Sequence, residues 1–388
     1  MAVEALSRIA EVSATDWDTL FASDNPFIQH RFLAALETHG CVGGATGWEP
    51  AHQVLRNPAG ELLAACPAYL KQHSYGEFVF DFSWAQASEQ LGEPYYPKLC
   101  ISVPFTPVNG PRLGARSTEY RRQLGQALQA WPQQHACSSL HVLFAESGDA
   151  DVLTEAGCLI REDIQFHWRN QNHADFDAFL ATLSSKRRKQ VRRERRKLAE
   201  ADIHFTISAG DELDEAQWRA VYALYAHTYH QRGQQPYLNQ AFWLDYGGTH
   251  GTPVRVCRAW RGDQLIACAL FVQGGDTLYG RHWGSREFVD GLHFETCYHQ
   301  GIAWCIRERI KYFDAGTQGQ HKQARGFDPV ITRSAHVLRN ARLRAAVSDY
   351  LQRERLAIAH AKEDLQQHSA YRRPADGKPD PSALAGSP

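Results

Sequence analysis

The amino-acid sequence predicts an α/β (α+β) protein in which a mixed, mostly antiparallel sheet flanked by helices occurs twice in tandem. Its length of 388 residues is enough for two domains that each bury a core of their own. Its hydrophobic fraction of 43%, with 10 Trp, 15 Tyr and 18 Phe, is typical of a packed globular protein and excludes a disordered chain. The third observation, an internal repeat of the predicted elements, is the most specific of the three.

Both copies of the repeat have the same order of elements: helix, two hairpin strands, strand, loop, helix and strand. The first copy comprises a helical region at Trp17 and the ranges 51–56, 61–66, 99–108, 118–135 and 140–144. The second copy comprises a helical region at Trp218 and the ranges 254–260, 264–270, 277–284, 293–310 and 311–314. Turn residues separate the hairpin strands in both copies, namely Asn57-Pro58-Ala59-Gly60 and Arg261-Gly262-Asp263.

Further helices are predicted between and after the two copies. Residues 175–183 place apolar side chains on one helical face, and a basic helix follows at 185–201 with Ser184 or Ser185 as its cap. Past Ser334 a long helix is predicted from an apolar stripe: Leu343, Val347, Tyr350, Leu351 and Ile358.

These elements divide the chain into two predicted domains, 1–165 and 166–370. The second domain includes the basic helix and the long C-terminal helix. The Pro, Gly, Ser and Asp content of the remaining residues, 371–388, predicts a disordered tail.

The formal net charge of −1 excludes a generally basic nucleic-acid-coating protein and a generally acidic one. Between Lys186 and Lys197, however, nine of twelve residues are basic and one is acidic, so this segment carries +8 and the other 376 residues sum to −9. One interpretation is contact with RNA phosphates, through these side chains: Lys186, Arg187, Arg188, Lys189, Arg192 and Arg193. The other interpretation is a solvated helix in which Val191 and Leu198 are the apolar residues that face inward.

The sequence also indicates a compartment. Nine cysteines, none spaced as Cys-x-x-Cys, do not fit a disulfide framework or a structural zinc site, and the 19 histidines show no ligand spacing, so we expect no metal. No apolar run approaches the roughly 20 residues of a membrane helix, and residues 1–13 lack the pattern of a secretory signal. We therefore expect a cytoplasmic protein without a membrane span.

Several segments carry a resemblance to a known family. In the second half they are Leu183 to Arg193, Tyr279 to Gly284, His293-Phe294-Glu295, and Phe313 to Gly316 followed by His321-Lys322. In the first half they are Pro67 to Ser83, Tyr95 to Leu99 and Val103 to Val108. Across about residues 13–340 the chain resembles the tandem-GNAT proteins grouped as Fem-like, or "peptidoglycan biosynthesis/recognition", proteins.

The resemblance implies a transferase that moves an acyl group, such as acetyl from acetyl-CoA, to a small-molecule or peptide amine, with peptidoglycan metabolism as the implied setting. The acyl-CoA signature of ordinary GNAT enzymes, Arg/Gln-x-x-Gly-x-Gly/Ala, is reproduced neither at 109–116 nor at 283–293. Aminoacyl-tRNA, the donor of Fem-type ligases, is therefore an alternative to acyl-CoA, with a peptidoglycan precursor as acceptor. A non-catalytic recognition module is the third hypothesis.

The candidate catalytic residues are Glu295, His299 and Tyr279. Glu295 and His299 are four residues apart and share a helix face, so Glu295 serves as a general base or orients His299. The alternative is a polar pair on a solvated helix. Tyr279 is a candidate proton donor to a leaving thiolate or ribose oxygen, or else an ordinary strand tyrosine.

The candidate substrate- or cofactor-binding residues are Arg281, His282, Trp283, Gly291, His293, Lys322, Arg325 and Lys98. Strand alternation places Tyr279, Arg281 and Trp283 on one face, with Gly280 and His282 on the other. An arginine among aromatics needs a carboxylate or an anionic ligand. Lys322 and Arg325, in a glycine-rich segment, suit anionic substrate groups, although lysines in such loops are usually just solvent exposed.

Overall fold

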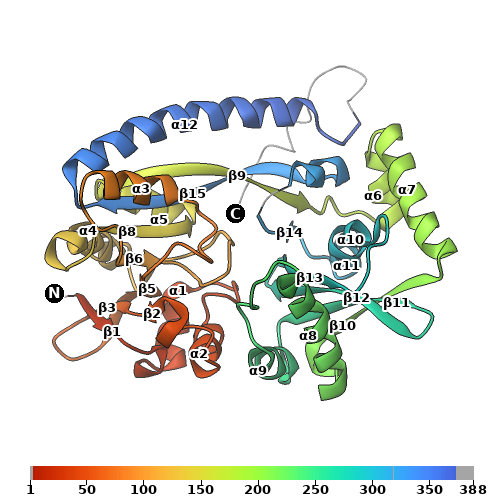
Figure 1. Ribbon diagram of the computed structural model, residues 1–388, viewed down its shortest axis with the longest axis horizontal. Helices are drawn as coiled ribbons and strands as arrows, with labels where there is room; N and C mark the ends of the chain where they lie inside the picture. Colours follow the sequence, from red (N-terminus) through yellow and green to blue (C-terminus); the bar gives the residue numbers. More distant parts are fainter. Residues whose placement is uncertain (1–2, 318, 373–388) are drawn as a thin grey trace. The chain divides into compact units, whose positions relative to one another are not determined.

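The computed structural model describes residues 3–317 and 319–372 (Figure 1). The described chain forms two compact units. Among the described residues, unit 1 takes 3–163 and 331–360, and unit 2 takes 164–317, 319–330 and 361–372. The predicted second domain, 166–370, differs from unit 2 because residues 331–360 pack within unit 1.

Unit 1 contains two sheets. The first has the order β2 (Trp48–Pro50), β5 (Ala68–Lys71), β6 (Lys98–Ile101), β8 (Ser139–Ala145) and β15 (Asp328–Leu338), and the second has β1 (Val3–Leu6), β3 (His52–Arg56), β4 (Leu62–Cys66) and β7 (Gly114–Ala115). Among these described strands only β6 and β8 pair in parallel. The helices of this unit are α1 (Ala14–Phe21), α2 (His30–Thr38), α3 (Phe82–Gln90), α4 (Thr118–Gln134), α5 (Ser147–Glu155) and the first part of α12 (Ala341–Gln367).

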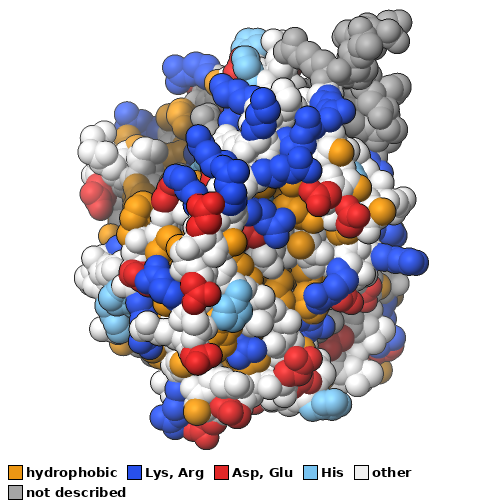
Figure 2. All heavy atoms as spheres, turned by 90° about the vertical axis from the view of Figure 1, so that its right-hand side faces the viewer, with side chains coloured by type: hydrophobic (Ala, Val, Ile, Leu, Met, Phe, Trp, Pro, Cys, Tyr) orange, Lys and Arg blue, Asp and Glu red, His pale blue; other side chains and the backbone are white. Residues whose placement is uncertain are grey.

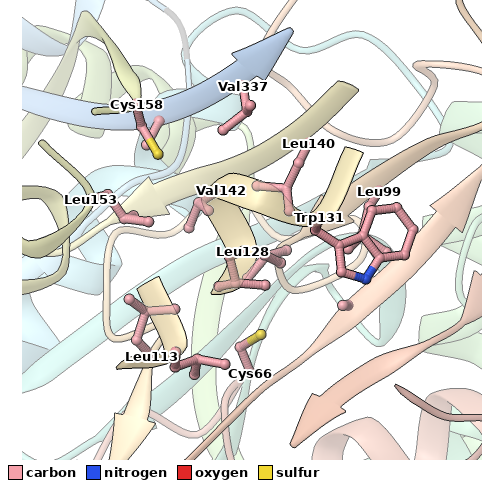
Figure 3. Close-up of a cluster of buried hydrophobic side chains, with 14 of the residues drawn as sticks. Cys66, Leu99, Leu113, Leu128, Trp131, Leu140, Val142, Leu153, Cys158 and Val337 are labelled. Atoms are coloured by element: carbon pink, nitrogen blue, oxygen red, sulfur yellow. The ribbon is translucent and has the colours of Figure 1, made fainter. Parts of the chain in front are cut away.

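The main core of unit 1 lies between helix α4 and the strands around β8. Leu128 and Trp131 of α4 pack with Leu140 and Val142 of β8, and Val337 of β15 joins them (Figure 3). A second cluster buries the predicted stripe of α12, since Leu343, Val347 and Leu351 pack against Trp84 and Tyr95. These contacts explain why residues 331–360 belong to unit 1 although they come last in the sequence.

Unit 2 contains one sheet with the order β10 (Ile203–Ala209), β11 (Val254–Arg261), β12 (Gln264–Gly274), β13 (Thr277–Ser285), β14 (Tyr312–Asp314) and β9 (Leu159–Arg169). Its helices are α6 (Phe176–Thr182), α7 (Ser185–Glu200), α8 (Glu215–His230), α9 (Gln240–Phe242), α10 (Leu292–Phe294), the π-helix η5 (Glu295–His299), α11 (Gln300–Arg307) and the 3-10 helix η6 (Gln320–Arg325). Helix α8 packs on β12 and β13, and η5 contacts β11 and β12. Phe271, Phe313 and Ile302 lie in the core of this unit.

The predicted repeat is confirmed. The hairpin β3–β4 corresponds to β11–β12, and a parallel pair joined through helices follows in each unit: β6 with β8, and β13 with β14. Each unit then gains an antiparallel strand that the sequence did not predict, β15 beside β8 and the end of β9 beside β14. Each of these strands begins in one unit and ends in the other.

Three local predictions need correction. The long helix does not begin just past Ser334, because Ser334–Leu338 completes β15 and α12 starts at Ala341. The β-rich run 99–108 is strand only to Ile101. Of the predicted tail, Tyr371 and Arg372 are ordered: Tyr371 Oη donates to Gly326 O at 2.7 Å, and Arg372 N donates to Thr182 O at 2.9 Å. The remaining tail residues lie outside the described chain.

Candidate functional site

The structure brings Glu295 and His299 together inside unit 2. His299 Nδ1 lies 3.0 Å from Glu295 Oε2, and both side chains are buried, with 1% and 2% of their surface exposed. The alternative of a solvated polar pair is therefore wrong. His299 Nε2 is buried and has no hydrogen-bond partner among the described residues. The pair thus resembles a carboxylate-oriented imidazole whose second nitrogen is free to accept a proton.

The π-helical turn explains why three side chains converge here. In a π-helix the hydrogen bonds run from i to i+5, so residues four and five positions on both lie near the side chain of residue i. Gln300 Nε2 accordingly donates to Glu295 Oε1 at 2.7 Å, beside the contact from His299. π-Turns inside α-helices often occur at functional sites. The predicted uninterrupted helix at 293–310 did not contain this feature.

A cation from α7 completes the surroundings of Glu295. Arg195 Nε lies 3.1 Å from Glu295 Oε1, and its guanidinium stacks 4.4 Å from the ring centroid of Phe176. Burial by itself raises the pKa of Glu295, but the hydrogen bond and charge of His299, followed by the charge of Arg195, outweigh it, and the net pKa is lowered. Glu295 is therefore a carboxylate at neutral pH. Phe176 also lies edge-on to His299, with ring centroids 6.0 Å apart.

Lys322 forms a second polar centre in unit 2. It is 1% exposed, and its Nζ donates to the carbonyl oxygens of Gly316 at 2.5 Å and Thr317 at 3.2 Å. Burial, only partly offset by Asp314, lowers the pKa of Lys322 to about 8. Asp314 accepts a hydrogen bond from Gly316 N at 2.8 Å and lies 3.6 Å from His167 Nε2. The expectation of a merely solvent-exposed lysine is wrong.

Arg281 sits in a β-bulge, and this changes the predicted faces of β13. His282 pairs with Leu270 and Gly280 with Phe271, so Arg281 is the extra residue. Arg281 and Trp283 therefore do not share a face: Arg281 interacts with Tyr225 and Tyr229 of α8, whereas Trp283 contacts His293 at 5.1 Å between ring centroids. Burial, partly offset by Asp314, lowers the pKa of Arg281 to about 10.

The other predicted residues of β13 and the following loop are His282, Tyr279 and Gly291, and the contacts described below lie within unit 2. His282 packs edge-on against Tyr225 at 4.9 Å between ring centroids, and burial lowers its pKa well below the ordinary value. Tyr279 is buried and pairs in register with Asp314. Gly291 has a φ of +83°, which a residue with a side chain rarely adopts, and its carbonyl accepts a hydrogen bond from Glu295 N at 3.0 Å.

A third group of residues links the two centres. The Oη atom of Tyr298 lies 3.0 Å from Nε2 of His321. Tyr298 precedes His299 in the sequence, and His321 precedes Lys322. The Arg325 guanidinium stacks 3.3 Å from the centroid of Phe294, and one of its nitrogens lies 3.6 Å from Glu194 Oε2. Burial, followed by the charge of His321, lowers the pKa of His293 to about 4, so this imidazole is neutral at physiological pH.

Lys98 belongs to unit 1, is distant from these groups in the sequence, and is fully buried. Its Nζ donates to Ser74 Oγ at 2.8 Å, Glu77 Oε2 at 2.8 Å and Asp81 Oδ2 at 2.5 Å, so its three donors are all satisfied internally. Burial raises the pKa of Glu77 to about 7 despite the charge of Lys98. In this conformation Lys98 is part of an internal ionic cluster rather than a free ligand donor.

The predicted basic helix is confirmed as α7. Val191 and Leu198 are buried as the predicted seam, while Glu194 and Arg195 turn toward Arg325 and Glu295. Ser184 is its N-cap, although its side chain makes no capping hydrogen bond. Of the predicted RNA contacts, Lys186, Lys189, Arg192 and Arg193 are exposed, and Arg187 and Arg188 are half-buried. Figure 2 shows Lys and Arg side chains gathered in the upper part of one face of the molecule.

A depression of about 660 Å³ opens at the N-terminal end of α7. It is lined by Ser184, Ser185, Arg188, Gln367, His368, Ser369, Tyr371 and Arg372. None of the predicted catalytic residues lines it, so it does not mark the Glu295–His299 pair.

The sequence missed four residues that shape the site: Arg195, Phe176, His167 and Gln300. Arg195 is one of nine cations in its segment, and nothing in the spacing distinguished it from its exposed neighbours. His167 comes from β9, a strand that the sequence did not predict. Gln300 could have been found only by expecting a π-turn, and Phe176 only as one of the apolar residues of the predicted helix at 175–183.

Comparison with known proteins identifies the fold. A family model described as FemAB-like, peptidoglycan biosynthesis/recognition, matches residues 8–373. The solved structure of FemX gives a TM-score of 0.51 at 10% identity, covering 90% of this chain and 100% of that one. The C-terminal domain of a putative lysylphosphatidylglycerol synthetase from Agrobacterium fabrum gives 0.52 at 10% identity, covering 89% and 95%.

A third structure, L-PGS from Bacillus licheniformis, gives a TM-score of 0.50 at 10% identity and covers 86% of this chain and 97% of that one. No curated protein sequence matches the chain. The structural likeness establishes the shared fold, and together with the family match it confirms the predicted resemblance and the tandem fold.

Proposed function

The chain belongs to the FemAB-like family of peptidoglycan biosynthesis and recognition proteins, and from this premise we propose that it is an N-acyltransferase that uses His299 as its base. The observation that carries the proposal is the buried Glu295–His299 hydrogen bond, with His299 Nε2 left without a partner in the described part of the chain. A buried carboxylate fixes the imidazole tautomer and stabilises the imidazolium formed when Nε2 takes a proton.

The proposed reaction forms an amide bond. The acceptor nitrogen attacks the carbonyl carbon of the donor while His299 Nε2 removes a proton from that nitrogen. The carbon–sulfur or carbon–oxygen bond of the donor then breaks, and the leaving thiolate or ribose oxygen takes a proton from Tyr279. Arg281 and Lys322 supply positive charge for anionic groups of the substrates. Lys322 would have to leave its two carbonyl partners to contact a substrate.

Phe176 is the proposed gate to the base. Its ring lies edge-on to His299 and stacks against Arg195, so a rotation of this side chain would open space beside His299 for the acceptor amine. Because Phe176 is the first residue of the short helix α6, such a rotation does not disturb the sheet that carries Tyr279 and Arg281. We therefore expect the acceptor to enter between α6 and η5.

Two donors are proposed. Acyl-CoA, such as acetyl-CoA, is the first. The second is aminoacyl-tRNA with a peptidoglycan precursor as acceptor, and it is supported by the family match, because aminoacyl-tRNA is the donor of Fem-type ligases. A thermal-shift panel of acyl-CoAs, aminoacyl-tRNAs and muropeptide precursors distinguishes them, because a ligand that binds the native state raises the melting temperature.

Turnover is then measured with the labelled donor that produced the shift. His299→Asn is expected to lower kcat by about a hundredfold or more, while the same change at the exposed His204 leaves kcat unchanged. Wild-type turnover in His299→Asn would refute the assignment of the base. Binding of a precursor without turnover by any donor would instead identify a non-catalytic recognition module.

A further inference from the structure

We propose that unit 2 docks on anionic lipid bilayers through a basic–aromatic surface formed by the outward cations of α7 together with Phe288. The proposal does not depend on the reaction catalysed, because it concerns binding alone. It also requires no membrane-spanning segment, and within the described residues no helix is long and apolar enough to cross a bilayer.

The outward side of α7 carries a line of exposed cations. They are Lys186, Lys189, Arg192, Arg193, Arg196 and Lys197. The opposite side is taken up by Val191 and Leu198, which are buried, and by Glu194 and Arg195, which turn toward the candidate site. A helix of this length extends for about 24 Å, so the cations form a straight row rather than a compact pocket.

Carboxylates do not neutralise this row. Within the described part of the chain, Lys186, Lys189 and Arg193 have no carboxylate at ion-pair distance. Three of the cations do have a carboxylate partner: Arg192 pairs with Asp177 at 3.0 Å, Arg196 with Glu200 at 3.7 Å and Lys197 with Asp290 at 3.2 Å. All six of these side chains are more than half exposed, and such pairs are weak. The row therefore keeps most of its positive charge for an external anion.

Phe288 stands beside this row as an exposed hydrophobic tip. It is 94% exposed, more than any other large hydrophobic side chain among the described residues. Its loop is held on both sides, because Glu287 pairs with Arg261 at 2.7 Å and Asp290 pairs with Lys197 at 3.2 Å. Val289 packs in the cluster that contains Leu198 of α7. The fold thus presents Phe288 next to the C-terminal half of α7.

An anionic bilayer fits both parts of the surface. A row of cations attracts acidic headgroups, at about fivefold in affinity for each Lys or Arg near the membrane surface. A phenylalanine side chain then gains by entering the acyl boundary below the headgroups. Single-stranded nucleic acid fits less well, because stacking platforms use several aromatics along a groove. Among the described residues, Phe288 is the only exposed large aromatic of unit 2.

The test is co-sedimentation of the full chain with vesicles of phosphatidylcholine, with and without phosphatidylglycerol, at low and physiological ionic strength. The wild type is expected to bind only the phosphatidylglycerol vesicles, and more strongly at low salt. The triple variant K186E/K189E/R193E should lower the partition coefficient at least about a hundredfold, because it removes three cations at about fivefold each. Phe288→Ser should lower it about tenfold without removing the salt dependence.

The matched control reverses the same number of charges elsewhere on unit 2. Arg219, Arg232 and Arg307 are exposed and outside the basic–aromatic surface, so R219E/R232E/R307E is expected to retain most of the binding. Circular dichroism and thermal unfolding establish that every variant folds. Equal loss of binding in both triple variants, or equal binding of the wild type to both vesicle types, overturns the proposal.

Two further outcomes separate this proposal from others. If K186E/K189E/R193E keeps vesicle binding but loses binding of a labelled tRNA, the surface belongs to RNA and the lipid proposal fails. The variant His299→Asn should bind vesicles as the wild type does, because His299 is buried far from solvent contact. Loss of turnover in that variant together with normal vesicle binding thus tests the proposed function without touching the lipid proposal.

Discussion

Gly284 on β13 offers a sharp test of how the sheet of unit 2 is held against α8. This glycine faces α8, and a Cβ added to it would lie 2.1 Å from the carbonyl oxygen of Leu224 and 2.6 Å from the amide nitrogen of Tyr225. Both atoms belong to the helix backbone, so no side-chain rotation relieves the contact. Gly284→Ala therefore forces α8 away from the strand that carries Tyr279 and Arg281.

The expected cost follows from this geometry. Overpacking of a close-packed interior costs about 1–3 kcal/mol when side chains can shift, and a rigid backbone places the cost at about 3 kcal/mol or more. For a unit of this size that corresponds to a melting temperature lower by roughly 6–12 °C. Urea unfolding and thermal unfolding, both followed by tryptophan fluorescence, measure the change in the free energy of unfolding.

Gly148 in α5 is the matched control. A Cβ there meets only a terminal nitrogen of Arg121, at 3.8 Å, so Gly148→Ala is expected to be neutral or to stabilise by about 0.5–1 kcal/mol through helix propensity. If Gly284→Ala unfolds within about 1 kcal/mol of the wild type, the close approach of β13 and α8 does not limit packing, and the reasoning is refuted.

Three further predictions concern buried polar groups. Burial, followed by the charge of Glu146, raises the pKa of Asp149 to about 6, so the wild type should lose stability as the pH rises from about 4 to about 6. Asp149→Asn cannot ionise. Urea titrations should find this variant about 3 kcal/mol more stable than the wild type at neutral pH but similar to it near pH 4, and a difference independent of pH contradicts this. For Glu295 the sign is opposite, because its lowered pKa stabilises the fold at neutral pH and this contribution disappears on acidification. Glu295→Gln should therefore flatten the acid limb of a pH–stability curve, and an unchanged limb argues against the contacts of Glu295 with His299 and Arg195. Tyr298→Phe removes the contact with His321 and should cost about 1 kcal/mol in thermal unfolding, whereas no change indicates that water replaces the hydroxyl.

The sequence was informative wherever the signal is local. The two hairpins, the helix at Thr118–Gln134 and the basic helix were predicted within a few residues, because periodicity, turn residues and capping act over short stretches of chain. The repeat itself followed from comparing such stretches. The i, i+4 spacing of Glu295 and His299 also placed both on one helix face, and the structure confirms that they meet.

The sequence did not determine the distances between elements that are far apart in the chain. Arg195 and Glu295 meet only because α7 and η5 pack against each other, and no local pattern distinguishes Arg195 from the other cations of its helix. The predicted faces of β13 failed for a related reason: the bulge at Arg281 depends on the pairing of β13 with β12, and a single inserted residue reverses the alternation.

By itself the sequence thus determined a tandem α/β fold, the identity of the helices and hairpins, and one catalytic candidate pair. Only the tertiary structure decided that β9 and β15 each begin in one unit and end in the other. It also decided that Lys98 and Lys322 are buried and that His299 Nε2 has no partner among the described residues. The physical reason is that burial and long-range strand pairing depend on the whole packed arrangement, whereas secondary structure depends largely on neighbouring residues.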